Sequence, residues 1–193
     1  MARTKDFDES EVLNKAVSLF WLKGYNGTSM QDLVDSLGIS RSSLYDTYGD
    51  KHTLYLKALE FYQNTSGSAM YNIVTNATSS KEAIKQLLEL VVNNLLNDKQ
   101  HKGCFMVNAE VEVAPHDTEV RDMLCKNEKQ IEEAFHLAIQ RGQQSGEITN
   151  RQEARAITRF FLTTIKGIQV SAKSTTDKAY FDDIIKTALS VLG

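Results

Sequence analysis

Residues 27–51, GTSMQDLVDSLGISRSSLYDTYGDK, constrain the fold more than any other part of this chain. In the first half of this stretch apolar residues recur at helical spacing, at Met30, Leu33, Val34 and Leu37. Gly38 follows them, and glycine suits the left-handed conformation that ends a helix. Ser40 can then cap a second helix, which ends at Gly49, and Asp50 can cap the helix that follows. Two short helices joined by a tight turn are typical of a helix-turn-helix, whose second helix enters the major groove of DNA.

The chain around these two helices resembles the DNA-binding region of the TetR family of transcriptional regulators. The resemblance rests on three runs, LFWLKGYNGTSM at 19–30, DLVDSLGIS at 32–40 and SSLYDTYGDK at 42–51. Beyond this first part of the chain, only the length and the helical layout are similar. The resemblance implies a three-helix helix-turn-helix domain at residues 1–51. It also implies a C-terminal helical bundle at residues 52–193 that binds a ligand and dimerises.

The periodicity of the whole sequence predicts helices almost throughout, so the expected fold class is all-α. The chain has one proline, Pro115, and no stretch that alternates apolar and polar residues as a half-buried strand does. About nine helices are expected. They include a fourth helix that runs from residue 51 towards 71, with Gly67 weakening its middle, and an eighth helix capped by Asn150. Because the domain boundary falls within the fourth helix, movement in one part of the chain would be passed rigidly to the other.

The charge of the chain counts against strong binding to phosphate. The net charge is −3, and residues 1–51 hold six basic side chains against eight acidic ones. High affinity for the DNA backbone usually comes from clustered Lys and Arg. Four acidic residues gather at the start of the first helix, where they suit its dipole: Asp6, Asp8, Glu9 and Glu11. The groups left to line the groove are helix N-termini together with Arg3, Lys5, Arg41 and Lys51. We therefore expect modest non-specific affinity for DNA.

The outer face of the second helix in the motif is expected to read the bases. Arg41 is the only long hydrogen-bond donor on this face, and an Arg side chain can bind guanine O6 and N7 together. The resemblance implies further contacts, so that the expected DNA-binding residues are Thr28, Ser29, Arg41, Ser42, Ser43, Tyr45, Tyr48 and Lys51. In this pattern Tyr48 packs under the helix while its hydroxyl touches phosphate, and the residues at helix starts contact the backbone. Thr47 departs from the pattern, because many relatives carry His there, and no phosphate contact is expected from it.

The resemblance also implies a ligand pocket and a dimer interface in the C-terminal bundle. A pocket among the fourth to eighth helices would be lined by Phe61, Tyr62, Tyr71, Phe105, Met106, Met123, Phe135 and Phe161. The last two helices would form a four-helix interface with a second copy through Phe160, Thr164, Gly167, Ser171, Ile184, Ala188 and Leu192. Packing within the chain explains the same aromatic and apolar stripes, so core positions remain the alternative for both sets.

No enzyme site is predicted from the sequence. The four histidines share no metal-ligand spacing, and the GxSxG, P-loop and GxGxxG motifs do not occur. Glu110 and Glu112 lie two residues apart, so they do not share a helix face, and a solvated or pocket-rim role is expected. Cys104 and Cys125 lie in helical apolar patterns and are expected to be buried, reduced thiols, with a redox switch as the alternative. We therefore expect no catalytic residue, metal or cofactor.

The partners expected for this chain are double-stranded operator DNA, a small-molecule effector and a second copy of itself. The N-terminus has no apolar h-region and no run of about 18 apolar residues occurs, so no membrane insertion is expected and the cytoplasm is the expected location. The predicted function is that of a ligand-released repressor on a palindromic operator. Two alternatives stay open: an activator of the same fold, and a helical interaction module without DNA binding.

Overall fold

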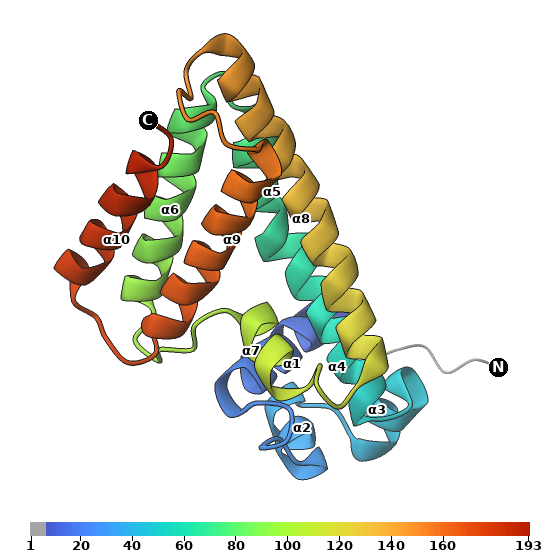
Figure 1. Cartoon of the computed structure of the whole chain (residues 1–193). Coiled ribbons are helices and arrows are strands. Elements are labelled where there is room, and N and C mark those ends of the chain that lie inside the picture. The colour runs from blue at the N-terminus through green and yellow to red at the C-terminus, as the bar shows by residue number, and fades with distance from the viewer. Residues whose placement is uncertain (1–6) are drawn as a thin grey trace.

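The computed structural model describes residues 7–193, except for the side chains of residues 66 and 67, and this part of the chain is helical without strands. Its α-helices are α1 (Glu9–Lys23), α2 (Met30–Leu37), α3 (Arg41–Tyr48), α4 (Lys51–Tyr62), α5 (Ser68–Asn76), α6 (Ser80–Asn97), α7 (Phe105–Glu112), α8 (Thr118–Ser145), α9 (Ala154–Ser171) and α10 (Lys178–Ser190). Figure 1 shows α1, α2 and α3 gathered at one end of the longer helices. The predicted all-α fold class is confirmed.

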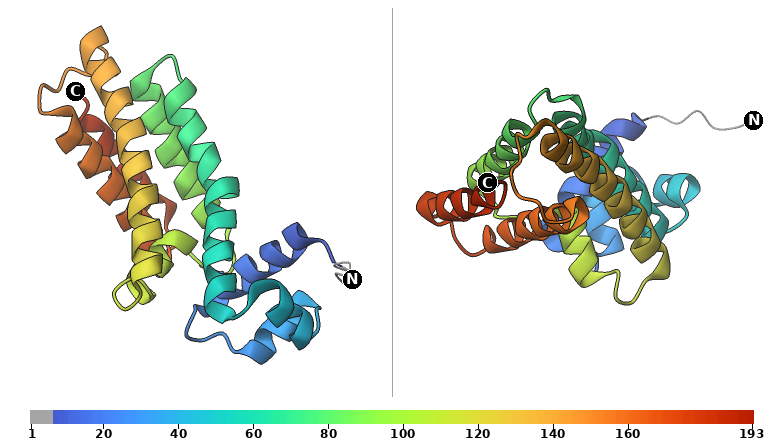
Figure 2. Two further views of the ribbon diagram at one scale, coloured as in Figure 1. Left: turned by 90° about the vertical axis from the view of Figure 1, so that its right-hand side faces the viewer. Right: turned by 45° about the horizontal axis from the view of Figure 1, so that its top comes forward.

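The predicted fourth helix is a rod of three segments. Helix α4 passes into a π-helical turn, η1 (Gln63–Gly67), which passes directly into α5 (Figure 2). The Thr65 hydroxyl donates a hydrogen bond to the Phe61 carbonyl at 2.8 Å, inside this turn. The rod ends at Asn76 and not near Tyr71 as predicted. Counted as one helix, it gives the predicted total of nine within the described residues.

Side-chain caps explain where the N-terminal helices begin. Asp8 caps α1 by accepting from the Ser10 N–H, and Ser40 caps α3 by accepting from the Ser43 N–H. Asp50 caps α4 in the same way, as the sequence predicted. Gly38 ends α2 with φ 69° and ψ 24°, the left-handed conformation that a side chain would strain. The tight turn between α2 and α3 therefore follows from local sequence alone.

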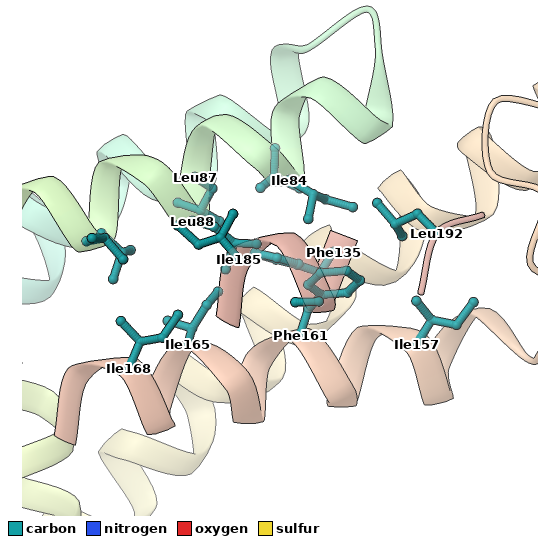
Figure 3. Packing of buried hydrophobic residues seen from close by; sticks show 14 of the residues in the cluster. Ile84, Leu87, Leu88, Phe135, Ile157, Phe161, Ile165, Ile168, Ile185 and Leu192 are labelled. Carbon is teal, nitrogen blue, oxygen red and sulfur yellow. The ribbon is translucent and has the colours of Figure 1, made fainter. Parts of the chain in front are cut away.

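Two hydrophobic cores organise the described residues. The N-terminal core joins α1 to α4 with α7 and the start of α8, through Val12, Phe20, Leu33, Leu37, Leu44, Leu54, Leu59, Phe105, Val120 and Leu124. The C-terminal core joins α5, α6, α8, α9 and α10, through Ile84, Leu88, Phe135, Phe161, Ile165, Ile185 and Leu192 (Figure 3). Helix α8 is 28 residues long and contributes to both. With the α4–α5 rod it connects the two cores.

The cap of α9 differs from the one that the sequence predicted. Glu153, and not Asn150, caps α9 by accepting from the Ala156 N–H at 2.9 Å. The Asn150 amide instead donates to the Val191 carbonyl at 2.7 Å, so it ties the loop before α9 to the end of the chain.

No helix in the described part of the chain combines the length and the apolar character needed to cross a membrane.

Candidate nucleic-acid interface and ligand cavity

The outer face of α3 presents a guanidinium group, a hydroxyl and a phenol to solvent. Arg41, Ser42 and Tyr45 are exposed, while Leu44 on the opposite face is fully buried. The Arg41 guanidinium lies 5.9 Å from the centroid of the Tyr45 ring, a cation–π contact that steadies it. Ser43 is only half-buried, and its hydroxyl lies 2.8 Å from the capping Ser40 hydroxyl. Arg41, Ser42 and Tyr45 are thus the predicted α3 residues that are exposed on this face, and the Ser42 hydroxyl also lies 2.9 Å from that of Ser40.

Arg41 also differs from the other cations in the described part of the DNA-binding region. Lys15 pairs with Glu11 at 2.7 Å, and Lys23 pairs with Asp32 at 2.6 Å. Within residues 7–51, Arg41 is the one cation with no oxygen partner in the structure. Arg3 and Lys5, which were also expected to line the groove, lie outside the described residues.

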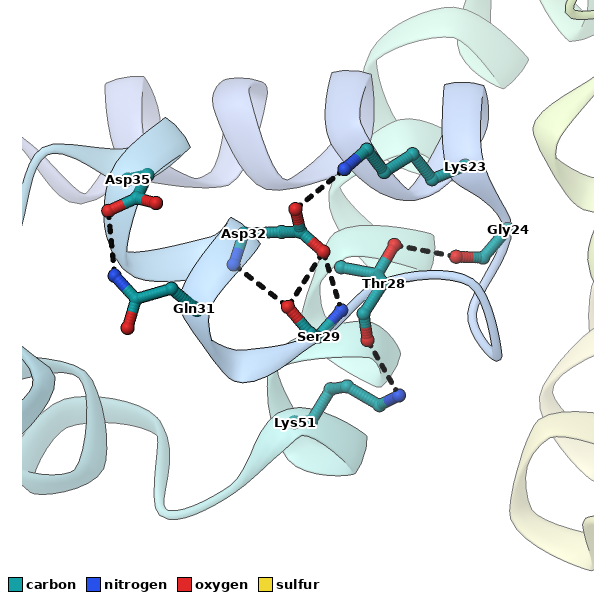
Figure 4. A network of polar contacts seen from close by, with 8 residues as sticks. All are labelled: Lys23, Gly24, Thr28, Ser29, Gln31, Asp32, Asp35 and Lys51. Carbon is teal, nitrogen blue, oxygen red and sulfur yellow. Dashed lines mark hydrogen bonds and ion pairs between the residues drawn. The ribbon is translucent and has the colours of Figure 1, made fainter.

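Thr28 and Lys51 hold the loop between α1 and α2 instead of facing solvent. Thr28 is buried, and its hydroxyl donates to the Gly24 carbonyl at 2.6 Å. The Lys51 ammonium donates to the Thr28 carbonyl at 2.9 Å (Figure 4). It also donates to the Tyr25 carbonyl at 2.9 Å and lies 4.2 Å from the centroid of the Tyr25 ring. The phosphate contacts of both side chains stay predictions, and the structure favours a role in holding this loop, because the Thr28 hydroxyl and two of the three Lys51 donors are already bonded inside the protein.

At the start of α2, the Ser29 hydroxyl donates a hydrogen bond to the Asp32 carboxylate of the same helix. Ser29 and Asp32 form a capping box, in which the Asp32 carboxylate also accepts from the Ser29 N–H at 2.9 Å (Figure 4). The hydrogen bond from Lys23 holds the pKa of Asp32 well below its usual range, and those from Ser29 act in the same direction. Ser29 is exposed. A phosphate that approached it would meet this ionised carboxylate, so Ser29 contacts DNA only if the capping box opens.

Tyr48 packs under α3 as predicted, but its hydroxyl does not face solvent. The side chain is 2 % exposed, and its buried hydroxyl has no hydrogen-bond partner among the described residues. Burial, with a smaller contribution from the negative charge of Glu9, raises the pKa of Tyr48 to about 12. The phosphate contact through this hydroxyl stays a prediction, and it requires the enclosed hydroxyl to become exposed when DNA binds.

Replacing Arg41 with alanine should weaken operator binding by about 1–3 kcal/mol and relax the preference at one base pair in each half-site. The physical reason is the loss of the one free bidentate donor on α3. Fluorescence anisotropy with operator variants at fixed salt measures both effects. Replacing the exposed Gln31 of α2 with alanine is the control and should leave base preference unchanged. Unaltered affinity and preference in the Arg41 variant would show that another residue reads the bases.

Replacing Lys51 with alanine should act through stability and not through the salt dependence of DNA binding. The change removes the Lys51 donor from the carbonyls of Tyr25 and Thr28, and the Tyr25 carbonyl then keeps only the hydrogen bond from the Thr28 N–H. The loss costs about 1–3 kcal/mol of unfolding free energy. Urea denaturation measures this loss. A direct phosphate contact would instead reduce the slope of log affinity against log salt by about one unit per site, with unchanged stability.

A cavity of about 150 Å³ lies between the end of α4, α7, α8 and α9. Its apolar wall includes Met70, Leu124, Ile131, Leu162 and Ile165. Three of the predicted pocket residues line it: Tyr62, Met106 and Phe135. The cavity lies among helices that the sequence assigned to the pocket, and these three residues are the predicted part of its wall.

Five predicted pocket residues do not line the cavity. Phe105 packs in the N-terminal core and Phe161 in the C-terminal core. Phe61 and Met123 are partly buried against the N-terminal core. Tyr71 is exposed and lies in a separate groove between the η1–α5 segment and α8. Aromatic and sulfur side chains pack equally well in a core and around a cavity, which is why the sequence did not separate the two.

The polar part of the cavity wall, which the sequence did not reveal, is a charged triad of Glu110, Lys166 and Glu128. The Lys166 ammonium donates to Glu110 Oε1 at 2.8 Å and to Glu128 Oε1 at 2.7 Å. Burial alone would lower the pKa of Lys166, but the hydrogen bonds to the two glutamates outweigh it and raise this pKa. The charged triad links α7, α8 and α9, and Glu110 occupies the pocket-rim position that the sequence allowed.

Glu112 connects α7 to the DNA-binding region. Its carboxylate accepts from the Asn26 N–H at 2.8 Å and from the Tyr25 N–H at 3.1 Å, in the loop between α1 and α2. A second connection joins His52 of α4 to Asp117, the cap of α8, at 2.7 Å. These contacts join segments that lie far apart in the sequence, and no sequence motif marks them.

The predicted dimer residues divide between an exposed face and the core. Phe160 and Gly167 are exposed on α9, where Val170 adds another large apolar side chain. Thr164, Ser171 and Ile184 are half-buried. Ala188 and Leu192 are buried in the C-terminal core of their own chain, so their assignment to the interface is corrected. Helical periodicity predicted the exposed and the buried residues together, because a helix can present one apolar stripe to its own core and another to a partner.

The described part of the chain holds no candidate metal cluster, and one expectation about the cysteines is wrong. Among the described residues, no group of three or more His, Cys, Asp and Glu side chains could hold a metal ion. Both cysteines are free thiols. Cys104 lines the cavity, and burial raises the pKa of its thiol. Cys125 is exposed on α8, so the expectation that it is buried is wrong.

Both halves of the chain match known protein families. Residues 12–58 match the family described as bacterial regulatory proteins, tetR family, and residues 80–188 match the tetracyclin repressor-like C-terminal domain. The chain belongs to the TetR family of transcriptional regulators. The predicted family is confirmed, and the chain is a helix-turn-helix regulator and not an enzyme.

Individual relatives of this TetR-family regulator are similar along its whole length. The HTH-type transcriptional regulator YezE of Bacillus subtilis is 36 % identical over 193 residues, which is 100 % of each chain. The HTH-type transcriptional repressor ComR of Escherichia coli is 26 % identical over 172 residues, or 89 % of this chain and 82 % of ComR. Among solved structures, a cysteine mutant of the TetR family regulator CifR with 26-bp double-strand operator DNA superposes with a TM-score of 0.86. It is 27 % identical, with 97 % of this chain and 98 % of that chain covered.

Proposed function

We propose that this TetR-family regulator is a repressor that binds a palindromic operator as a homodimer in the cytoplasm and leaves it when a small molecule occupies the cavity. The observation that carries the proposal is the exposed face of α3, where Arg41 is free of any oxygen partner beside Ser42 and Tyr45. Support comes from ComR, which is named a repressor, and from CifR, which was solved with operator DNA.

A homodimer would present two α3 helices to one face of DNA. A helix-turn-helix dimer binds two half-sites about 34–36 Å apart, so that the recognition helices meet successive major grooves. The exposed apolar side chains Phe160 and Val170 on α9, with Tyr180 on α10, offer a surface for the second copy. Gly167 lies among them, and a Cβ added there would meet no atom within 4 Å of its own chain.

The contacts of α7 and of the α4–α5 rod support release by a ligand. The cavity touches Tyr62 at the end of α4 and Glu110 on α7. Helix α7 in turn holds the loop between α1 and α2 through Glu112. A ligand that shifted α7 or α4 would therefore move α1 to α3 relative to a partner copy. It can do so only by binding the two conformers with different affinities.

Replacing Glu112 with glutamine should weaken this coupling. A carboxamide offers one acceptor atom where the carboxylate accepts from both Tyr25 and Asn26, so α7 holds the loop less firmly. The ligand should still bind the cavity with wild-type affinity, while its effect on operator affinity falls by about tenfold, or about 1.4 kcal/mol of coupling. Replacing the exposed Glu89 of α6 with glutamine is the matched control. Full coupling in the Glu112 variant would remove α7 from the route.

Reciprocity tests the proposed release. A ligand that lowers operator affinity by a given factor must itself bind the operator complex more weakly by the same factor. Calorimetry with and without operator DNA gives one factor, and anisotropy with and without ligand gives the other. Equal factors above one support the proposal, whereas a ligand that binds the cavity and leaves operator affinity unchanged contradicts it.

In vitro transcription distinguishes a repressor from an activator, and band shifts on the DNA upstream of its own gene distinguish both from an interaction module.

A further inference from the structure

We infer that the cavity takes a small, mostly apolar molecule with a hydrogen-bond donor and no negative charge, whose donor is directed at the charged triad. This inference rests on the proposed function, because it names the chemical class of the effector. It is supported by the size of the cavity, the apolar character of its wall and the arrangement of charge at the triad.

The size and the wall of the cavity set the apolar part of the ligand. Its volume is about 150 Å³. A dry, apolar cavity of about 150 Å³ holds one benzene molecule. Leu124, Phe135, Leu162 and Ile165 line it from α8 and α9. The ligand body that fills this space is therefore about one ring or an aliphatic group of the same size.

The charge of the wall excludes an anionic ligand. Lys166 is the only Lys, Arg or His side chain among the lining residues, and both of its neighbours are carboxylates. With both glutamates ionised, the charged triad has a net charge of −1. A ligand carboxylate would therefore compete with Glu110 and Glu128 for one ammonium while lying close to both of them. Like charges brought together in this way repel each other, so a ligand with no negative charge is favoured.

The geometry of the charged triad provides acceptors for a donor. Lys166 contacts Oε1 of each glutamate, so Oε2 of Glu110 and of Glu128 is not used by Lys166. The three side chains keep between 35 % and 46 % of their surface exposed. A ligand ammonium or hydroxyl there would hydrogen-bond to a carboxylate oxygen while remaining partly hydrated. The ligand ring would then occupy the apolar interior.

A groove beside the cavity offers a route for the ligand. Gln63, Asn127 and Ile131 line both the cavity and this groove, which runs between the η1–α5 segment and α8. Gln63 begins the π-helical turn η1. A π-helical turn interrupts the regular hydrogen-bond ladder, and such turns often occur at functional sites. The groove therefore leads to the cavity beside this turn.

Calorimetric titration of the full chain with benzylamine, benzyl alcohol and benzoate tests the inference, because the three probes share one ring and differ in the polar group. Benzylamine and benzyl alcohol should each bind at least about tenfold more tightly than benzoate. Benzoate binding as tightly as benzyl alcohol would overturn the inference. Failure of all three to bind would overturn it as well, since the cavity would then not accept a ring of this size.

Matched variants locate the preference at the charged triad. Changing Glu110→Gln and Glu128→Gln together should reduce the preference for benzylamine over benzoate by at least about tenfold. The single change Glu128→Gln, checked by circular dichroism, should reduce it in the same direction if the double variant does not fold. The control Glu89→Gln on α6 should leave the preference unchanged. An unaltered preference in a folded triad variant would contradict the inference.

Operator release is measured separately, so a probe that binds as expected without releasing operator contradicts only the proposed function.

Discussion

Replacing Phe105 with alanine should lower the free energy of unfolding by about 3–5 kcal/mol, the cost of removing a fully buried aromatic side chain. Phe105 is 1 % exposed, and its ring centroid lies 5.7 Å from that of Tyr55 and 5.6 Å from that of Tyr62, both edge to face. It begins α7 and packs in the N-terminal core, so it anchors the helix that links the cavity to the DNA-binding region.

Urea denaturation followed by circular dichroism measures the effect of this change. Val111 lies on the same helix and is 72 % exposed, so Val111→Ala is a control expected to stay within about 0.5 kcal/mol of wild type. A loss below about 1 kcal/mol in Phe105→Ala would mean that α7 is not anchored in the N-terminal core. The role of α7 in coupling would then fail with it.

Replacing Gly167 with glutamate should convert a dimer into a 21.7 kDa monomer and reduce operator affinity by about 10²–10⁴-fold. The added carboxylate would lie on the exposed face of α9, between Phe160 and Val170, where a partner helix would bury it without a counter-ion. The isolated chain should tolerate the change, because the new Cβ meets no atom within 4 Å and glutamate favours a helix more than glycine does. Each monomer would then bind only one half-site.

Light scattering at low micromolar concentration gives the mass, and anisotropy gives the operator affinity of the same sample. The control is Gln140→Glu, which adds the same charge to an exposed position on α8. A wild-type mass in the Gly167 variant would place the dimer interface on another surface. A monomer that kept wild-type operator affinity would show that dimerisation is not needed for binding.

Local features of this protein could be predicted from its sequence because their causes are local. Ser40 and Asp50 cap the helices that the sequence assigned to them, and Gly38 has the left-handed conformation required by the turn. The apolar stripe of α2 fixed which face Leu33 and Leu37 bury. Caps, turns and helical periodicity depend on residues only a few positions apart, so one sequence is enough to find them.

Contacts between distant segments could not be predicted in the same way. The sequence showed Lys51 at the start of a helix, but not that the carbonyls of Tyr25 and Thr28 would bind its ammonium. Likewise Glu110 and Lys166 are 56 residues apart and meet only because α7 packs beside α9. Which side chains surround a cavity depends on helix packing, and periodicity does not determine it. The DNA-binding role of α3, the dimer seam and the domain boundary at residue 51 stay predictions.

Competition between operator DNA and a shuffled duplex of the same composition tests most directly whether the exposed face of α3 reads a palindromic site. The operator is first located by footprinting the DNA upstream of the gene with the full chain. We predict two protected major-groove segments about one helical turn apart, and operator binding that is about 10³-fold or more tighter than binding to the shuffled duplex at the same salt. The Arg41→Ala variant should lose part of this ratio. Equal affinity for the two duplexes, or a ratio that does not change in the Arg41 variant, would contradict the account.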